Sequence, residues 1–177
     1  KEECELHSLM ILRHGKVAVE TYQTPLTRDD PHMVYSVSKS FLATAFGFAL
    51  DEGLLTKETK FLEIFPDYKP KRQDKYLEKL TIAHLVSMTS GKAASVKGRS
   101  EKDWIKLFLK AKWAFEPGTD WRYINDNFYV AAAAITRVTK MSVTEYLTPR
   151  LFEPLGIDVP VWEKSPTGIE AGGWGLF

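Results

Sequence analysis

Two short motifs carry side chains that could cleave an amide or ester bond. In the first, Ser36 and Lys39 stand three residues apart at the start of an apolar run. Positions i and i+3 share one face of a helix, so the amine of Lys39 can reach the hydroxyl of Ser36. A serine hydroxyl is a weak nucleophile until a neighbouring base takes its proton, and a neutral lysine can act as that base. The spacing therefore predicts a nucleophile next to its base.

The apolar run at residues 41–50 is expected to bury this helix and to shield its first turn from water. Ser36 would then lie at a helix N-terminus, where free backbone N–H groups can bind a developing oxyanion. A second interpretation stays open, in which Ser36 is an N-cap followed by a solvated lysine. A chain of this length is expected to contain about one Ser-x-x-Lys by chance.

The second motif, Tyr123-x-Asn125, follows a turn predicted from Glu116-Pro-Gly-Thr119. A tyrosine can exchange protons with a leaving group if a nearby cation such as Lys39 lowers its pKa. The amide of Asn125 can hold that lysine or a substrate amide. The alternatives are a half-buried Tyr123 with a hydrogen-bonded hydroxyl and an Asn125 that caps the following helix.

Hydrophobic periodicity and turn residues predict the elements that would position these motifs. They are a β-hairpin over 9–22 that turns at Gly15, a helix over 41–52 that ends at Gly53, a short helix within 77–88 capped by Thr81, a helix that starts at 100–103, a helix over 127–139, and a helix opened by the Ser142–Glu145 capping box that stops before Pro154. Residues 156–177 are predicted to be loop with little strand.

Composition excludes several classes of protein. The 177 residues are 44% hydrophobic and 27% charged, as in ordinary globular chains, and the single cysteine, Cys4, excludes a disulfide scaffold. With 24 Lys and Arg against 23 Asp and Glu, nothing indicates a nucleic-acid partner, and residues 69–75 are predicted to be a solvated basic loop. No run is long enough to cross a membrane. The sequence is compatible with export to the periplasm or to the extracellular space, and equally with a cytoplasmic location.

The predicted hairpin stands alone, followed by a long helical middle. An isolated two-stranded hairpin is marginally stable and leaves both edges unpaired. We therefore expect its sheet to need strands from beyond Phe177 or from another chain, and we interpret the sequence as incomplete. Self-association through the open edge is a corollary of this prediction.

At these motifs the sequence resembles the penicillin-recognising serine hydrolases, in the branch of class C β-lactamases, DD-peptidases and family VIII carboxylesterases. Tyr-Ser-Val-Ser-Lys-Ser at residues 35–40 is similar to the family's first motif. Phe115-x-Pro-Gly118 leading into Tyr123-x-Asn125 is similar to its second. Three further stretches resemble family framework, in the family's order: residues 85–91, 152–157 and 171–173.

This resemblance implies a role for each motif residue. Ser36 would be the acylated nucleophile, Lys39 its proton acceptor, Tyr123 the proton relay to the leaving group, and Asn125 a contact to substrate and lysine. The substrate would be a β-lactam, a D-amino-acid peptide or a small ester. No metal or organic cofactor is implied, and the four histidines lack metal-site spacing.

The resemblance also implies an α/β (α+β) β-lactamase-like fold, in which an antiparallel sheet domain carries an inserted all-helical domain. Residues 1–55 would start the α/β domain, 56–155 would form the helical domain, and 156–177 would return to a truncated α/β domain. The resemblance implies that the C-terminal strands of that domain are missing from this chain.

Two features depart from the family pattern. The third motif, Lys or His followed by Thr or Ser and Gly, is absent, because Lys164-Ser-Pro-Thr-Gly168 has the wrong spacing. That strand supplies an oxyanion donor, and loss of one such donor typically costs about 10²- to 10³-fold in rate. Met88 stands where relatives often carry histidine, and we expect it to be structural. The alternative function is therefore a non-catalytic binding or assembly module that retains the fold.

Overall fold

The computed structural model describes residues 6–95 and 101–177, and the chain divides into two compact units. Unit 1 spans Lys1–His32 and unit 2 spans Met33–Phe177. The boundary between these units lies between residues 32 and 33 and does not test the predicted domain boundaries at 55 and 155, which stay a prediction.

Unit 1 contains the predicted hairpin, with strand β1 at Ser8–Arg13 and strand β2 at Lys16–Tyr22. The strands pair antiparallel, and the register shifts between Ile11 and Leu12 so that Ala18 is unpaired. Gly15, at φ +72°, occupies the turn as predicted. Among the described residues the sheet has only these two strands, and their side chains are exposed on both faces. Self-association through this hairpin stays a prediction.

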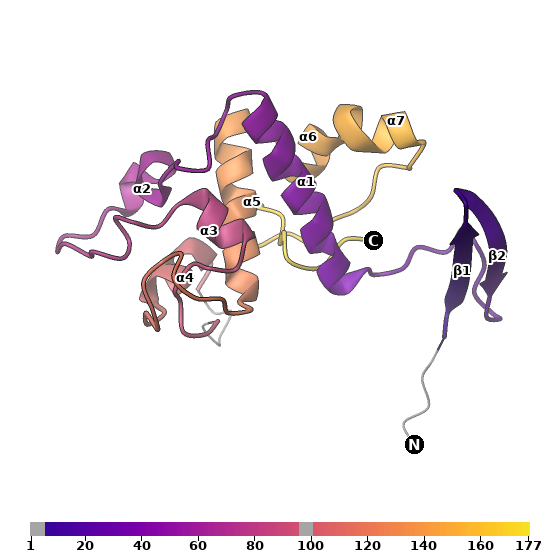
Figure 1. Ribbon diagram of the computed structural model, residues 1–177, viewed down its shortest axis with the longest axis horizontal. Helices are drawn as coiled ribbons and strands as arrows, with labels where there is room; N and C mark the ends of the chain where they lie inside the picture. Colours follow the sequence, from indigo (N-terminus) through magenta and orange to yellow (C-terminus); the bar gives the residue numbers. More distant parts are fainter. Residues whose placement is uncertain (1–5, 96–100) are drawn as a thin grey trace, which may run out of the picture. The chain divides into compact units, whose positions relative to one another are not determined.

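Unit 2 is helical (Figure 1). Its helices are α1 (Ser38–Asp51), α2 (Phe61–Ile64), α3 (Ile82–Val86), α4 (Trp104–Lys110), α5 (Asn125–Thr139), α6 (Val143–Leu147) and α7 (Glu153–Leu155), with 3₁₀ turns at Tyr35–Val37 and Pro66–Tyr68 and a π-helical turn at Thr148–Phe152.

Helix α5 forms the centre of this unit, and helices α1, α3, α4 and α6 pack against it (Figure 1). All of its residues from 127 to 135 are buried. Four of them are the consecutive alanines at 131–134, and these small side chains let neighbouring helices approach closely. The ends of α5 carry the polar residues, so the centre of the unit is apolar and the motif Tyr123-x-Asn125 lies at its edge.

Helix α1 presents its buried face at helical spacing. Lys39, Leu42, Phe46 and Ala49 are all buried along this face, whereas Ser40 is exposed. Lys39 therefore belongs to the stripe that packs into the unit, as the apolar run that follows it predicts.

Most sequence-predicted caps are present. Thr81 caps α3, and its hydroxyl accepts from the backbone N–H of His84. Ser142 and Glu145 form the predicted capping box of α6. Asp103 caps α4 with its carboxylate, so this helix begins at Trp104 rather than within the predicted 100–103, and Ser100 lies outside the described residues. Each of these caps is formed by residues that lie two or three positions apart in the sequence.

Two helix predictions are wrong in detail. The backbone stays helical through Pro154, which lies at the second position of α7, where a missing N–H costs no hydrogen bond. Helix α5 begins at Asn125 rather than 127, with Ile124 as its N-cap. Asn125 is thus the first helical residue and does not cap the helix.

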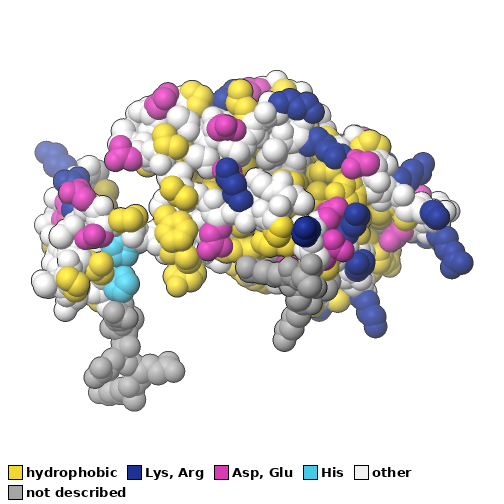
Figure 2. Space-filling view, turned by 180° about the vertical axis from the view of Figure 1, so that it is seen from behind, with side chains coloured by type: hydrophobic (Ala, Val, Ile, Leu, Met, Phe, Trp, Pro, Cys, Tyr) yellow, Lys and Arg dark blue, Asp and Glu magenta, His cyan; other side chains and the backbone are white. Residues whose placement is uncertain are grey.

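The charged side chains of the face in Figure 2 alternate in sign, with Lys and Arg interspersed among Asp and Glu. None of the helices described is both long and apolar enough to span a lipid bilayer. In the C-terminal stretch, Lys164 pairs with Glu170 and Trp162 pairs with Leu176 as isolated β-bridges. This is the small amount of strand pairing predicted there.

Candidate active site

Ser36, Lys39 and Tyr123 meet at the start of helix α1. Ser36 lies in the 3₁₀ turn that leads into this helix, and Lys39 lies in the helix's first turn. The amine of Lys39 donates to the Ser36 hydroxyl at 3.0 Å. On its other side, Ser36 Oγ is 2.6 Å from the Tyr123 hydroxyl, which is 87 residues away in the chain. The structure therefore brings three predicted site residues into hydrogen-bond contact.

The three side chains differ in their access to solvent. Ser36 is exposed and Tyr123 is 48% exposed, whereas only 9% of Lys39 is exposed. The amine of Lys39 also lies 4.9 Å from the ring centroid of Tyr123 and 5.6 Å from that of Phe128. The interpretation of Lys39 as a solvated lysine is therefore wrong, and a buried amine lies behind an exposed hydroxyl.

The electrostatics of Tyr123 favour proton transfer. Partial burial raises the pKa of its hydroxyl, but hydrogen bonding to Lys39 and Ser36 and the positive charge of Lys39 outweigh that effect. The pKa of Tyr123 is consequently lowered. A phenol whose pKa is lowered gives up its proton more readily, as a donor to a leaving group must.

A backbone group that the sequence analysis did not single out completes the surroundings of the lysine. The amine of Lys39 donates to the carbonyl oxygen of Gly173 at 2.6 Å, across 134 residues of chain. A Cβ at Gly173 would lie 3.5 Å from that amine and 3.3 Å from the Phe128 Cβ. At Gly172, φ is +67° and a Cβ would come within 2.5 Å of the Phe128 carbonyl oxygen. The two glycines are therefore needed for close approach to α1 and α5.

The first turn of α1 also holds this segment. Ser38 Oγ donates to the Tyr35 carbonyl at 2.5 Å and accepts from the Leu176 N–H at 3.3 Å. The Val34 N–H donates to the Leu176 carbonyl at 3.0 Å. These bonds fix the C-terminal segment beside the nucleophile turn, and so place the Gly173 carbonyl at the lysine.

Met88 braces the loop that carries Tyr123. Its carbonyl accepts from the Arg122 N–H at 2.9 Å, and its sulfur accepts from the Ile124 N–H at 3.3 Å and from Asn127 Nδ2 at 3.5 Å. These bonds flank Tyr123 on both sides in the chain. Met88 is buried and has no contact of this kind with Ser36 or Lys39, in keeping with the structural role predicted for it.

Asn125 is the first residue of α5. Its side chain is exposed, and within residues 6–95 and 101–177 it makes no hydrogen bond to Lys39, whose donors serve Ser36 and Gly173. A contact of Asn125 with substrate stays a prediction.

The string Lys164-Ser-Pro-Thr-Gly168 does not join this site through any hydrogen bond described. Ser165 is buried, and its hydroxyl forms hydrogen bonds with the hydroxyls of Tyr129 and Thr167.

His84 is half-buried in the cap of α3, and burial lowers the pKa of its imidazole. No cluster of three or more metal-ligating side chains occurs in the described residues.

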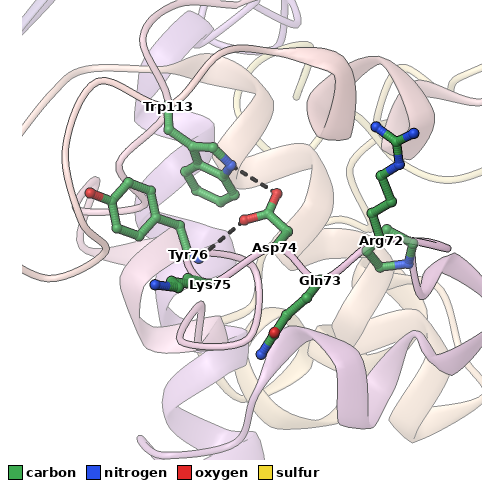
Figure 3. Close-up of a pocket in the computed structure, with 7 residues that line it drawn as sticks. Arg72, Gln73, Asp74, Lys75, Tyr76 and Trp113 are labelled. Carbon is green, nitrogen blue, oxygen red and sulfur yellow. Dashed lines mark hydrogen bonds between the residues drawn. The ribbon is translucent and has the colours of Figure 1, made fainter.

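A separate hollow of about 530 Å³ lies over the basic loop, lined by Pro70, Arg72, Gln73, Asp74, Lys75, Tyr76 and Trp113 (Figure 3). In it, Asp74 accepts from the indole N–H of Trp113 at 3.0 Å and from the backbone N–H groups of Tyr76 and Leu77. None of the predicted site residues lines this hollow, so it is distinct from the Ser36 site.

Comparison with known proteins assigns the family. The beta-lactamase family profile matches residues 7–176, nearly the whole chain. The chain belongs to the beta-lactamase family. Family membership confirms the resemblance to the serine hydrolase superfamily.

Among curated relatives, the family member "Beta-lactamase" of Escherichia coli K12 is 25% identical over 155 residues, covering 85% of this chain and 40% of its own length. "Protein flp" of Staphylococcus aureus strain MW2 is 26% identical over 167 residues, covering 84% of this chain and 33% of its own. The chain thus spans well under half the length of these relatives.

Solved structures confirm the β-lactamase-like fold. A Bacillus anthracis protein named as a candidate 6-aminohexanoate-dimer hydrolase superimposes with a TM-score of 0.81 at 17% identity, over 96% of this chain and 50% of its own. The SurE structure superimposes with a TM-score of 0.72 at 21% identity, over 90% of this chain and 36% of its own. At these identities the likeness concerns the fold alone.

Proposed function

We propose that this beta-lactamase family chain carries the nucleophile and proton-transfer groups of a serine hydrolase that cleaves amide or ester bonds through an acyl-enzyme on Ser36. The observation that carries the proposal is the contact of one exposed hydroxyl with both a buried amine and a phenol. Ser36 Oγ lies 3.0 Å from Lys39 Nζ and 2.6 Å from the Tyr123 hydroxyl. Both distances allow direct proton transfer.

In the acylation step, Ser36 Oγ attacks the substrate carbonyl carbon while its proton passes to a neutral Lys39 amine. A tetrahedral intermediate forms, and the bond from carbon to the leaving nitrogen or oxygen then breaks. The leaving atom takes the proton of the Tyr123 hydroxyl, and the protonated Lys39 returns a proton to Tyr123. The acyl group is left as an ester on Ser36.

In the deacylation step, water attacks the ester carbonyl carbon and gives its proton to the same pair of groups. The bond to Ser36 Oγ breaks, Ser36 recovers a proton, and a carboxylic acid leaves. Over both steps one water is consumed and one acyl bond is hydrolysed. The lysine and the tyrosine end in their starting protonation states, so the cycle needs no cofactor.

The substrate class follows from this chemistry. An acyl-enzyme mechanism suits β-lactams, D-amino-acid peptides and small esters alike, because each presents a carbonyl with a leaving nitrogen or oxygen. The name of the Escherichia coli relative, "Beta-lactamase", supports the β-lactam among these candidates. The proposal concerns the activity of the whole protein.

A fluorophosphonate probe tests the nucleophile directly. We expect the unmodified chain to gain the mass of one phosphonyl group, which is the probe less HF, and Ser36→Ala to gain none. Ser40→Ala is the matched control, since Ser40 is an exposed serine in the first turn of α1, close to Ser36 in the chain but outside the hydrogen-bonded group. It should be labelled like the unmodified chain. Equal labelling of Ser36→Ala would refute the assignment, and reversible ligand binding without any adduct would favour the binding-module alternative.

A further inference from the structure

Tyr35, which directly precedes Ser36, is held in an unusual conformation. Its φ is +43°, in the left-handed region that glycine adopts freely and that a bulky side chain disfavours. The backbone there is fixed by the bond from Ser38 Oγ to the Tyr35 carbonyl. Glycine would relieve the strain, so the presence of tyrosine needs another reason.

The packing of the unit does not supply that reason. The Tyr35 side chain is 71% exposed. Within the described residues its hydroxyl has no hydrogen-bond partner and its ring lies against no other aromatic ring. Residues held in sparsely populated backbone conformations cluster at functional sites, which directs attention to a ligand of this exposed side chain.

Trp121 is a second exposed aromatic residue at the site. It is 60% exposed, and its ring centroid lies 6.4 Å from that of Tyr123, with the two planes at 55°. Tyr123 in turn contacts Ser36 at 2.6 Å. The indole therefore borders the proposed proton donor.

We propose that Tyr35 and Trp121 are specificity-determining residues that bind an aromatic or flat apolar group of the substrate beside the bond that Ser36 attacks. The inference rests on the proposed function and adds to it a preferred substrate class. Tyrosine and tryptophan suit this task because they offer large, flat contact areas with few rotatable bonds. An aromatic substituent on the substrate would stack against rings that otherwise face water.

Two fluorophosphonate probes with the same leaving group test this. One carries a short alkyl chain and the other a phenylalkyl chain. In both, a bond forms between Ser36 Oγ and phosphorus, the phosphorus–fluorine bond breaks, and fluoride leaves. The ratio of their second-order labelling rates, followed by intact mass, therefore reports binding of the phenyl group. We expect the phenylalkyl probe to react roughly 2- to 10-fold faster, the worth of one aromatic pair.

The variants locate this preference. Trp121→Ala and Tyr35→Gly should each bring the ratio toward one, and Trp121→Phe should keep most of it. Leu155→Ala, which removes a 64% exposed apolar side chain on α7, should leave the ratio unchanged. Thermal unfolding followed by circular dichroism checks that every variant is folded.

The outcomes separate the two proposals. An adduct on Ser36 whose rate ratio is the same in the unmodified chain, Trp121→Ala and Tyr35→Gly overturns this inference and leaves the proposed function standing. An equal change in Leu155→Ala overturns it as well. No adduct with either probe overturns the proposed function, and this inference with it.

Discussion

Lys39 and Lys92 are both buried lysines of the helical unit, and their surroundings differ in one decisive respect. Lys92 is only 1% exposed, and its amine donates to the carbonyls of Ala111 at 3.0 Å and Leu109 at 3.4 Å. It also lies 3.5 Å from the ring centroid of Trp113. Its donors are thus used to cap the C-terminal end of α4. The donors of Lys39 serve one carbonyl and one exposed hydroxyl.

The comparison shows that burial alone does not make a lysine a candidate base. Both amines are withdrawn from water, but only Lys39 touches a group that a substrate can reach. Burial lowers the pKa of Lys92 to about 8, and the charge of Asp74 opposes this shift. Lys92 therefore has a lowered pKa but contacts no exposed hydroxyl, and it provides an internal control for Lys39.

The largest expected effect is on labelling. Lys39→Met should slow the reaction of Ser36 with a fluorophosphonate by about 10²- to 10⁴-fold, the usual contribution of a general base. Lys92→Met should leave the labelling rate nearly unchanged, because the amine bonds to the carbonyls of Leu109 and Ala111 rather than to Ser36. Stopped reactions analysed by intact mass give both rates. Similar slowing in the two variants would show that the comparison between the lysines is wrong.

The second effect concerns stability, and it belongs to Lys92. Its folded-state pKa of about 8 lies below the value of 10.5 for a free lysine, so the unfolded chain binds more protons between these limits. The free energy of unfolding should therefore rise with pH from 8 to 10.5, by about 3 kcal/mol for this group alone. Below pH 8 the destabilisation is fully present.

Urea unfolding at several pH values, in the unmodified chain and in Lys92→Met, isolates that contribution as the difference between two curves. Other lysines and tyrosines titrate in both proteins and cancel. Parallel curves across this range would contradict a lowered pKa for Lys92.

A smaller effect is expected at Gly173. In Gly173→Ala the new methyl group would lie 3.5 Å from the Lys39 amine and 3.2 Å from the Asn125 carbonyl oxygen, so neighbouring atoms must shift. A small displacement of the base should slow labelling by about 10-fold, since misplacement by 1 Å can cost 10²-fold.

Gly47→Ala is the control for that variant. Gly47 lies within α1, and a Cβ there meets no atom within 4 Å. It should leave labelling unchanged and stabilise the helix by roughly 0.5–1 kcal/mol. If the two alanine variants label equally fast, the Gly173 carbonyl does not position the lysine.

Local rules predicted much of this structure. The hairpin, the Thr81 cap and the Ser142–Glu145 box depend on residues close together in sequence, and all are present. The nearness of Ser36 and Lys39 follows from helical spacing, and the burial of Lys39 follows from the apolar run after it. Family order of the motifs then indicated the partnership with Tyr123, which spacing alone could not give.

Other features could not be predicted, because they depend on contacts between distant segments. The bond from Lys39 to the Gly173 carbonyl spans 134 residues, and the sulfur of Met88 accepts from a loop 36 residues further on. The positive φ of Tyr35 leaves no mark on sequence patterns, since non-glycine residues rarely adopt it. The helical conformation of Pro154 was not predicted either, because a proline is compatible both with the end of one helix and with the first turn of another.

The acyl-enzyme on Ser36 is the central claim, and trapping it is the most direct test. The chain is mixed with a penicillin and, separately, with an activated aryl ester, quenched in acid, weighed intact and digested for peptide mapping. The account predicts a mass increase equal to the acyl group from at least one reagent, located on Ser36 and absent in Ser36→Ala. An unchanged mass with both reagents, or an adduct located on another residue, would contradict it.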